Sequence, residues 1–204
     1  MPFLLRVSLP DVPGSLGRLA SAIGEAGGDI EAIEIVEKRA GCAVDDVLLE
    51  LSPGRLPDSV VSACNSVDGV EVLWISRYAA GGNLFMDLEV VEELTSNPAD
   101  ALSIVIDRLP AAFRVDWAVR LRRGSGPHAA EVVRSTGGAP DDLAWPSIDA
   151  ATRLADPDDV TVLCAVPLGN DVVVLGRRGG PEFVDSELAR LTHLLGLART
   201  ISRR

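Results

Sequence analysis

At 204 residues, the chain has room for one large domain or two small ones, and 47% hydrophobic against 24% charged residues is ordinary for a folded globular protein. Residues 1–83 carry six basic against twelve acidic side chains, a net −6, and residues 84–204 carry thirteen against eighteen, a net −5. Because the total of −11 is spread over both halves, the charge argues against a domain that binds nucleic acid or an anionic membrane surface.

The chain begins with a predicted strand and a predicted helix that are joined by a short turn. Every second residue from Phe3 to Leu9 is apolar, which predicts a strand with one buried face. From Leu16 to Ile23 the apolar residues recur every three or four positions, which predicts an amphipathic helix that ends near Gly27.

The turn between these two elements has a chemistry of its own. Asp11 can accept backbone hydrogen bonds from residues just after it, and Pro13 fixes its own φ. Gly14 permits a close approach of the backbone, and Ser15 is suited to cap the helix. Free N–H groups at such a helix start are a natural seat for a carboxylate or another anion.

Four further elements complete the first half. Residues Ile30–Arg39 have apolar side chains on both parities, as expected for a strand covered on both faces or for a strand with a bulge. Val44–Leu51 alternates as a third strand, Leu56–Val67 has helical spacing, and Val70–Arg77 reads as a fourth strand. The resulting order, βαββαβ, is the ferredoxin-like split motif.

The turn motif also resembles a known family. Its D-x-P-G-x-L pattern, followed about a dozen residues later by Gly28-Asp29-Ile30, resembles the first half of an ACT domain, and the resemblance covers about residues 1–78. It implies a regulatory ferredoxin-like domain that binds an amino acid at an interface between two copies. The ligand-binding positions implied here are Asp11, Val12, Pro13, Gly14, Ser15, Leu16, Asp29 and Ile30.

The residue types at these positions fit the two ends of an amino acid. The N–H groups of Gly14 to Leu16 suit a carboxylate, and the side chain of Asp29 suits an ammonium group. The alternative is a structural turn in a domain that only pairs with another copy. In either case the two sheet edges must be protected, so we expect a homodimer formed mainly through residues 1–78.

Residues 79–83 are all small and uncharged and include two glycines, so they form the predicted linker to a second domain at residues 84–204. Two helices are expected there, around Leu84–Leu94 and Leu102–Leu109, and then strands at Val115–Leu121 and Val132–Val133. The remaining expected elements are a short helix near Ile148–Leu154, strands at Val160–Val166 and Val172–Gly176, and a last helix with Asp185 as its N-cap.

This order is similar to that of a GAF-like α+β domain with an antiparallel sheet. The similarity is carried by the hairpin from Ala165 to Arg177 and by the helix that follows Phe183-Val184-Asp185. The cyclic-nucleotide signature of that family is absent from the sequence, so the resemblance implies the fold and no particular ligand.

Three cysteines, Cys42, Cys64 and Cys164, without a C-x-x-C pair fit neither a disulfide framework nor a zinc site. Cys64 and Cys164 are expected to be small core residues. A reducing cytoplasm is the expected location, with no signal peptide, and no apolar run reaches the length of about 18 residues that a membrane span needs.

The other polar candidates are better explained as surface or turn residues than as metal ligands or catalytic groups. His128 and His193 have no metal-ligand spacing and are expected at the surface, and the acidic run Asp156–Asp159 lacks the pattern of a calcium loop and reads as a polar turn. No catalytic motif is present in the sequence, and no cofactor or metal is expected.

The sequence therefore predicts a non-catalytic regulatory sensor that binds an amino acid through its first domain and a second ligand or a partner through its GAF-like domain. An output domain is not recognisable, so the signal would pass to a protein partner that the sequence does not identify. The alternative is an assembly module that binds proteins and no small molecule.

Overall fold

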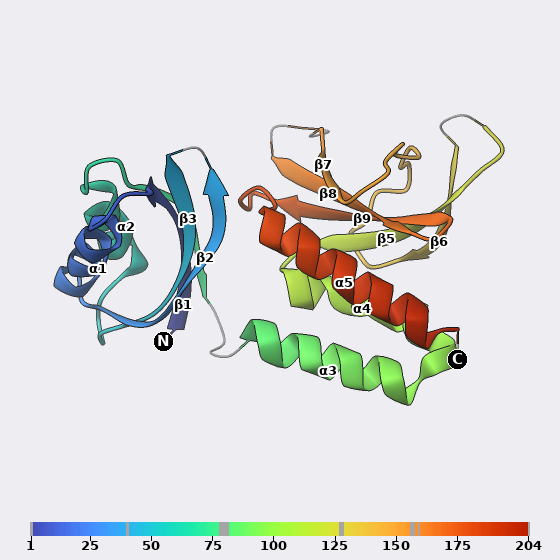
Figure 1. The fold of residues 1–204 in the computed structure, drawn as a ribbon, viewed down its shortest axis with the longest axis horizontal. Helices are drawn as coiled ribbons and strands as arrows, with labels where there is room; N and C mark the ends of the chain where they lie inside the picture. The colour runs from blue at the N-terminus through green and yellow to red at the C-terminus, as the bar shows by residue number, and fades with distance from the viewer. Residues whose placement is uncertain are drawn as a thin grey trace. The chain divides into compact units, whose positions relative to one another are not determined.

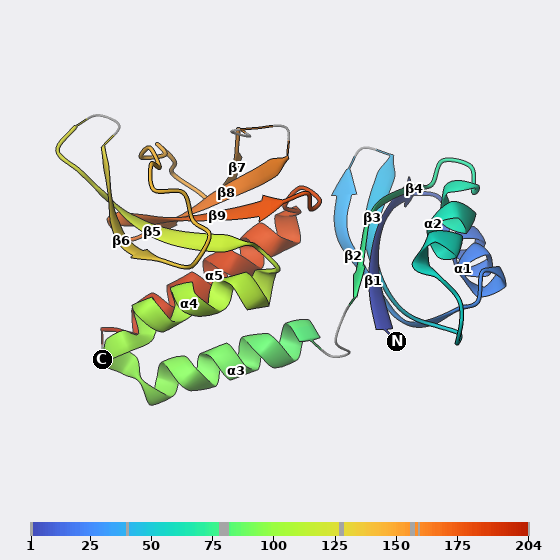
Figure 2. The same ribbon diagram turned by 180° about the vertical axis from the view of Figure 1, so that it is seen from behind.

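The computed structural model describes residues 2–39, 41–77, 82–126, 129–155, 158 and 160–203, without the side chains of residues 39 and 82–85. It divides the chain into two compact units, Met1–Gly82 (unit 1) and Asn83–Arg204 (unit 2; Figures 1 and 2). Each unit is a mixed α+β fold with its own antiparallel sheet, of four strands in unit 1 and five in unit 2. Among the described residues, no helix has both the length and the apolar character of a membrane span.

Unit 1 has the predicted βαββαβ order. Its sheet has the strand order β2-β3-β1-β4, so β2 and β4 are the edges, and both helices cover the same face (Figure 1). The elements are β1 (Pro2–Pro10), α1 (Ser15–Glu25), β2 (Gly28–Arg39), β3 (Cys42–Leu51), α2 (Pro57–Asn65) and β4 (Glu71–Arg77).

The core of unit 1 follows the predicted alternation. The odd-numbered residues from Phe3 to Leu9 on β1 point toward the helices, where they meet Leu19 and Ile23 of α1. Cys64 on α2 is fully buried in the same cluster, as expected for a cysteine that acts as a small core residue. The apolar residues that repeat every two positions on β1 and about every 3.6 positions on α1 therefore pack together in one layer.

The mixed apolar parity of β2 is explained by bulges. The pairing of β2 with β3 shifts register between Ile30 and Ala32 and again between Ile35 and Glu37. Each bulge moves the following side chains to the other face of the sheet. Of the two structures expected for this strand, the bulged one is confirmed.

Unit 2 contains α3 (Gly82–Ser96), the 3₁₀ turn Pro98–Asp100, α4 (Ala101–Phe113), β5 (Trp117–Arg123), β6 (Ala130–Ser135), β7 (Thr152–Leu154), β8 (Thr161–Leu168), β9 (Asp171–Arg178) and α5 (Asp185–Ile201). The strand order is β6-β5-β9-β8-β7, and every pair is antiparallel. The predicted order of helices, antiparallel strands, a long crossover and a closing helix is confirmed.

Both faces of this second sheet are covered. Helices α4 and α5 pack on one face, and α3 lies alongside them (Figures 1 and 2). On the other face, Leu143, Trp145 and Ile148 of the irregular segment 136–151 pack against the cluster around Trp117. This irregular segment therefore covers that face of the sheet with its apolar side chains.

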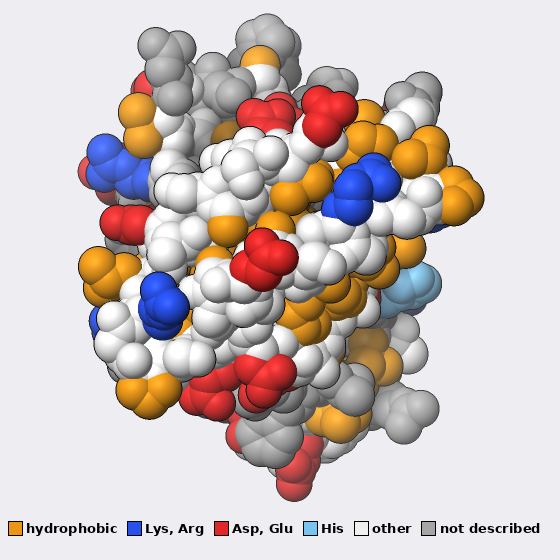
Figure 3. All heavy atoms as spheres, turned by 90° about the vertical axis from the view of Figure 1, so that its left-hand side faces the viewer, with side chains coloured by type: hydrophobic (Ala, Val, Ile, Leu, Met, Phe, Trp, Pro, Cys, Tyr) orange, Lys and Arg blue, Asp and Glu red, His pale blue; other side chains and the backbone are white. Residues whose placement is uncertain are grey.

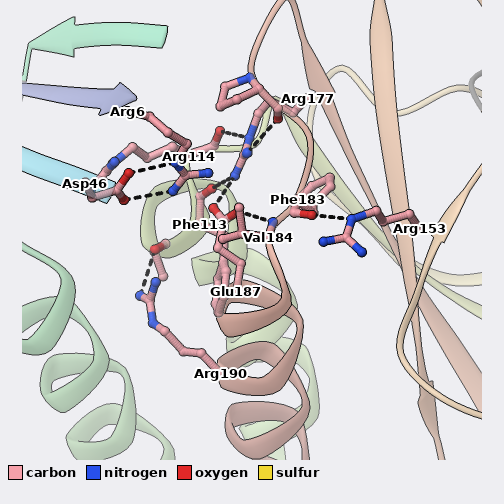
Figure 4. A network of polar contacts seen from close by, with 12 residues as sticks. Arg6, Asp46, Phe113, Arg114, Arg153, Arg177, Phe183, Val184, Glu187 and Arg190 are labelled. Carbon is pink, nitrogen blue, oxygen red and sulfur yellow. Dashed lines mark hydrogen bonds and ion pairs between the residues drawn. The ribbon is translucent and has the colours of Figure 1, made fainter. Parts of the chain in front are cut away.

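A buried arginine joins three elements of unit 2 (Figure 4). Arg177 of β9 donates to the main-chain oxygens of Phe113 at 2.8 Å and Arg114 at 3.2 Å, which end α4. It also donates to the carboxylate of Glu187 in the first turn of α5, at 2.8 Å, and its guanidinium lies 4.4 Å from the centre of the Phe183 ring. One cation thus satisfies carbonyl groups that the α4 helix leaves open.

Two local predictions for unit 2 are wrong. Residues Thr152–Leu154, expected in a short helix, form β7 and pair with β8. Ile148 and Leu154 pack against the cluster around Trp117, whereas Ala151 between them packs against the α4–α5 cluster, so these residues do not share one helix face. Asp185 is the first residue of α5 and not its N-cap, since Val184 holds the cap position and its N–H donates to Glu187.

The domain boundary stays a prediction. Residues 79–81 of the expected linker lie outside the described residues, and α3 already begins at Gly82. We expect limited proteolysis between residues 79 and 83 to release two fragments that both keep their secondary structure, because each cluster of buried apolar side chains is built from one unit only. Circular dichroism of the separated fragments would contradict two independent domains if both spectra were those of unfolded chains.

Candidate functional site

Two backbone hydrogen bonds close the turn after β1. The N–H group of Asp11 donates to the carbonyl of Gly41 at 3.0 Å, and the N–H of Ser15 donates to the carbonyl of Val12 at 3.2 Å. Between them, Gly14 has a φ of +90°, in the left-handed region that favours glycine. The backbone of the turn therefore favours glycine at this position.

The start of α1 presents free backbone donors. The first helical hydrogen bond runs from the N–H of Arg18 to the carbonyl of Gly14, at 3.1 Å. Within the described part of the chain, the N–H groups of Gly14, Leu16 and Gly17 have no acceptor. The guanidinium of Arg18 lies beside Gly14, 3.6 Å from where a Cβ would stand. Three donors and a cation at a helix start form a seat for an anion.

Two side chains of the turn act differently from what the sequence predicts. Ser15 does not cap α1, because it is the first helical residue, is buried, and accepts a hydrogen bond from Arg18 at 3.0 Å. The carboxylate of Asp11 bonds the ammonium group of Lys38 on β2, at 3.1 Å from each oxygen, and not the turn's own backbone. Val12, Pro13 and Leu16 are exposed as expected for a contact surface.

The other predicted positions lie far from the turn within one chain. Asp29 pairs with Glu50, and Arg39 pairs with Cys42, so β2 begins at the end of β3 opposite to the turn. Pro10, which precedes the turn, also pairs with Cys42. Eight residues of strand separate the two ends, or about 25 Å. The structure therefore brings Asp11 to Leu16 together, but Asp29 and Ile30 reach that site only if they come from a second copy.

A buried carboxylate lies on β3, three residues from Cys42, which pairs with the end of β1. Asp45 of β3 is 2% exposed, and its Oδ1 has no hydrogen-bond partner among the described residues. Its pairing with Val7 places it on the helix-bearing face of the sheet, in register with Ala43 and Val47. Burial raises the pKa of the Asp45 carboxyl above its ordinary value of 3.8, the charges of Asp11 and Asp46 raise it further, and Lys38 lowers it.

Sequence reasoning missed Arg18, Lys38 and Asp45. The signal for Asp45 was present, because the alternation that puts Val47, Leu49 and Leu51 in the core also puts residue 45 there. Lys38 could not be assigned to the turn, since only the register of β2 against β3, with its two bulges, brings it level with Asp11. Arg18 lies within the predicted helix, and nothing in the sequence pattern indicates that its side chain lies beside the turn.

The buried charge makes a prediction about stability. Asp45→Asn is expected to raise the free energy of unfolding of unit 1 by about 1–3 kcal/mol at pH 7, because it removes an uncompensated buried charge at nearly constant volume. The matched change Asp46→Asn should lower it, since Asp46 accepts two hydrogen bonds from Arg6 at 2.7 and 2.8 Å. Amide hydrogen exchange of β1 and β3 measures both, and a destabilised Asp45→Asn variant would contradict the expectation.

The same prediction has a pH dependence of known sign. Because the pKa of Asp45 is raised in the folded state, folding takes up a proton at pH values between the unfolded pKa of about 3.8 and the higher folded pKa. The loss of stability caused by burying the Asp45 charge is therefore absent in acid. It grows as the pH rises through this window and is complete above it. The stability gained by Asp45→Asn should shrink toward zero near pH 4.

The remaining predicted candidates are placed as follows. His193 is exposed on α5 and Cys164 is buried, as expected, while Cys42 is exposed. Asp158 accepts hydrogen bonds from the N–H groups of Val160 and Thr161, which supports a polar turn. His128 and residues 156, 157 and 159 lie outside the described residues. The described residues contain no cluster of His, Cys, Asp or Glu that could hold a metal ion.

Charged side chains also occur elsewhere, on the face of the molecule in Figure 3 and in two grooves of unit 2. Figure 3 shows scattered acidic and basic side chains on the face it views, and no single basic surface there. In unit 2, a groove of about 550 Å³ between α3 and α4 is lined by Glu89, Glu92, Glu93 and Arg108. Another of about 570 Å³ lies beside α5 and is lined by Asp149, Pro167, Asp185 and Leu188.

Unit 1 is a small domain with the ferredoxin-like βαββαβ fold, and its first helix begins at a turn with free backbone donors. Residues 3–61 match the family model described as the ACT domain. ACT domains are regulatory domains that sense small molecules, and the family match covers the turn, β2, β3 and Asp45. No curated protein matches the chain.

Several solved GAF domains are similar to the chain. One, from an Acinetobacter phosphoenolpyruvate-protein phosphotransferase, is 13% identical and covers 61% of this chain and 95% of its own, with a TM-score of 0.46. Another, from a putative sensor histidine kinase of Pseudomonas syringae pv. tomato, is 18% identical over 57% of this chain and 83% of its own, at 0.45. A third, from a Coxiella burnetii phosphoenolpyruvate-protein phosphotransferase, is 17% identical over 62% and 96%, at 0.45.

Proposed function

We propose that the protein is a non-catalytic regulatory sensor whose ACT domain binds an amino acid at the turn formed by residues 11–16. The observation that carries this proposal is the set of free N–H groups of Gly14, Leu16 and Gly17 beside the Arg18 guanidinium. A carboxylate placed there would accept hydrogen bonds from these N–H groups at the start of α1. It would also be stabilised by the positive end of the helix dipole.

The proposed site is shared between two copies. β2 is an edge strand, so its outer hydrogen-bonding groups can pair with the β2 of a second copy. If this pairing is antiparallel across a two-fold axis, the beginning of one β2 lies opposite the end of the other. Asp29 and Ile30 of the second copy would then lie near Lys38 and the turn of the first, which restores the two halves of the predicted site.

This arrangement predicts a homodimer. Multi-angle light scattering of the full chain at tens of micromolar should give twice the mass of 21.5 kDa. Because the pairing uses an exposed strand edge, the dimer should persist when α3 to α5 are removed by cleavage near residue 80. A monomeric mass at these concentrations would count against a shared site.

Calorimetric titration tests the function itself. Each of the twenty amino acids, and the common nucleotides as candidates for unit 2, is titrated singly into the full chain, and the melting temperature is measured alongside. At least one amino acid should bind and raise the melting temperature, since a ligand that binds only the folded state stabilises it. If no compound gives a heat of binding, the sensor is contradicted. A stoichiometric protein partner whose binding no compound alters would then support an assembly module.

A further inference from the structure

The outer strand β6 of the unit 2 sheet has an uncovered edge. It lies at one end of the strand order, and its residues from Glu131 to Ser135 are all exposed. Val132 and Val133 are 50% and 39% exposed, although both are large apolar side chains. An exposed apolar edge strand is a template for another strand unless a local feature prevents the pairing.

A bulge in β6 places two opposite charges on one face of the sheet. Glu131 pairs with Arg122 of β5, and Arg134 pairs with Arg120, while the register skips Val133 between them. Because residues 122 and 120 of β5 are two apart and share a face, Glu131 and Arg134 share that face too. Without the bulge, residues 131 and 134 would lie on opposite faces.

The contacts of Arg134 confirm which face this is. Arg120 pairs with Val173 of β9, which belongs to the cluster under α4 and α5. On this face the Nε of Arg134 donates to the carboxylate of Asp107 on α4, at 2.9 Å. A guanidinium has five N–H donors, so Arg134 can bond Asp107 and a second carboxylate at the same time.

The main-chain groups of β6 that face away from β5 are arranged symmetrically. The N–H of Thr136 donates to the carbonyl of Ala118 at 3.0 Å. The N–H of Gly124 donates to the carbonyl of Ala129 at 2.9 Å. Since inward and outward groups alternate on each side of the bulge, residues 131 and 134 face β5. The residues whose main-chain groups face outward are Ala130, Val132 and Ser135.

We propose that β6 pairs with β6 of a second copy of this chain, antiparallel across a two-fold axis at Val132. Ala130 then lies opposite Ser135 of the second copy, and Glu131 lies opposite Arg134 of the second copy, with the reverse pairs across the axis. Charges protect an edge strand when like charges would meet, whereas here unlike charges meet. The surface is distinct from the β2 edge of unit 1, and the inference does not depend on amino-acid binding.

Disulfide formation across the proposed axis tests the pairing in the full chain. β6 has six residues and β2 has twelve, so this pairing is the weaker of the two and a cross-link is needed to trap it. Cα atoms of hydrogen-bonded antiparallel partners are about 5.5 Å apart, which a disulfide can span. Val132→Cys is placed in a Cys42→Ser background, which removes the exposed native cysteine. The matched control is Val160→Cys, at a side chain of unit 2 that is 53% exposed.

Mild oxidation at tens of micromolar should convert most of the Val132→Cys chains into a covalent dimer on a denaturing gel and should leave Val160→Cys monomeric. Adding either Glu131→Arg or Arg134→Glu makes like charges meet at both symmetry-related pairs, and should reduce the covalent dimer about tenfold. An equimolar mixture of the two charge-reversed chains brings unlike charges together again. Its covalent dimer should return to the level of Val132→Cys alone, which also shows that both variants are folded.

Three results would overturn the inference. The first is equal cross-linking of Val132→Cys and Val160→Cys. The second is a cross-link at residue 132 that neither charge reversal reduces. The third is a mixture of the two reversed chains that fails to restore the covalent dimer. Because no amino acid is added, none of these results bears on the proposed ligand site.

Discussion

Replacement of Arg177 by methionine is expected to lower the free energy of unfolding of unit 2 by about 3–5 kcal/mol, the usual cost of removing one partner of a buried ion pair. The side chain of Arg177 is 6% exposed and makes four hydrogen bonds, to the main-chain oxygens of Phe113, Arg114 and Pro181 and to Glu187 (Figure 4). Methionine fills similar space but leaves these acceptors without their donor, and the contact with the Phe183 ring loses its charge.

The neighbouring residue provides the control. Arg178 is exposed, so Arg178→Met makes the same chemical change at the surface and should cost less than about 0.5 kcal/mol. Hydrogen exchange in peptides from β9 and α5 reports the stability of unit 2 in the full chain, and peptides from β1 and β3 report unit 1. Equal effects of the two substitutions on β9 and α5 would show that the buried network does not stabilise the unit.

Gly14→Val is expected to abolish amino-acid binding and to destabilise unit 1 by about 1–3 kcal/mol. The sequence alone predicts a small cost for a surface turn, but the φ of +90° at Gly14 is strained for a β-branched residue. Binding is lost for a separate reason. A Cβ at this position stands 3.6 Å from the Arg18 guanidinium, and the two methyl groups of valine would occupy the approach to the free N–H groups.

The matched control for this substitution is Gly24→Val. Gly24 lies in the same helix and has a negative φ, and a Cβ there would meet nothing within 4 Å. It should keep both binding and stability. Calorimetry at a temperature where all three proteins are folded separates the two effects, and binding that survives in Gly14→Val would place the ligand elsewhere, leaving the turn a structural role.

The sequence predicts β1 and α1 of unit 1 well because each of these two elements has a single strong period. The odd residues of β1 and the spacing of Leu19 and Ile23 on α1 both report one buried face. In unit 2 the spacing from Ile148 to Leu154 predicts one helix, although Ile148 and Leu154 pack against the Trp117 cluster and Ala151 packs against the α4–α5 cluster. Periodicity cannot separate two packing contacts that share a spacing by chance.

The candidate site could be predicted only in part, for a similar reason. The residues from Asp11 to Leu16 are adjacent in the sequence, so local turn chemistry was enough to find them. Lys38 joins them through its ion pair with Asp11, which depends on the register of three strands and on two bulges that no local pattern encodes. Asp29 was placed opposite the turn by resemblance, and the register shows that only a second copy can put it there.

The central claim is that the start of α1 binds the carboxylate of an amino acid, and amide chemical shifts test it most directly. Two-dimensional ¹H–¹⁵N NMR spectra of the full chain are recorded while each of the twenty amino acids is added singly. For at least one of them, the largest saturable shifts should be those of the Gly14, Leu16 and Gly17 amides, the three donors without an acceptor in the described structure. Saturable shifts that leave these three amides unmoved, or no shifts with any amino acid, would contradict the account.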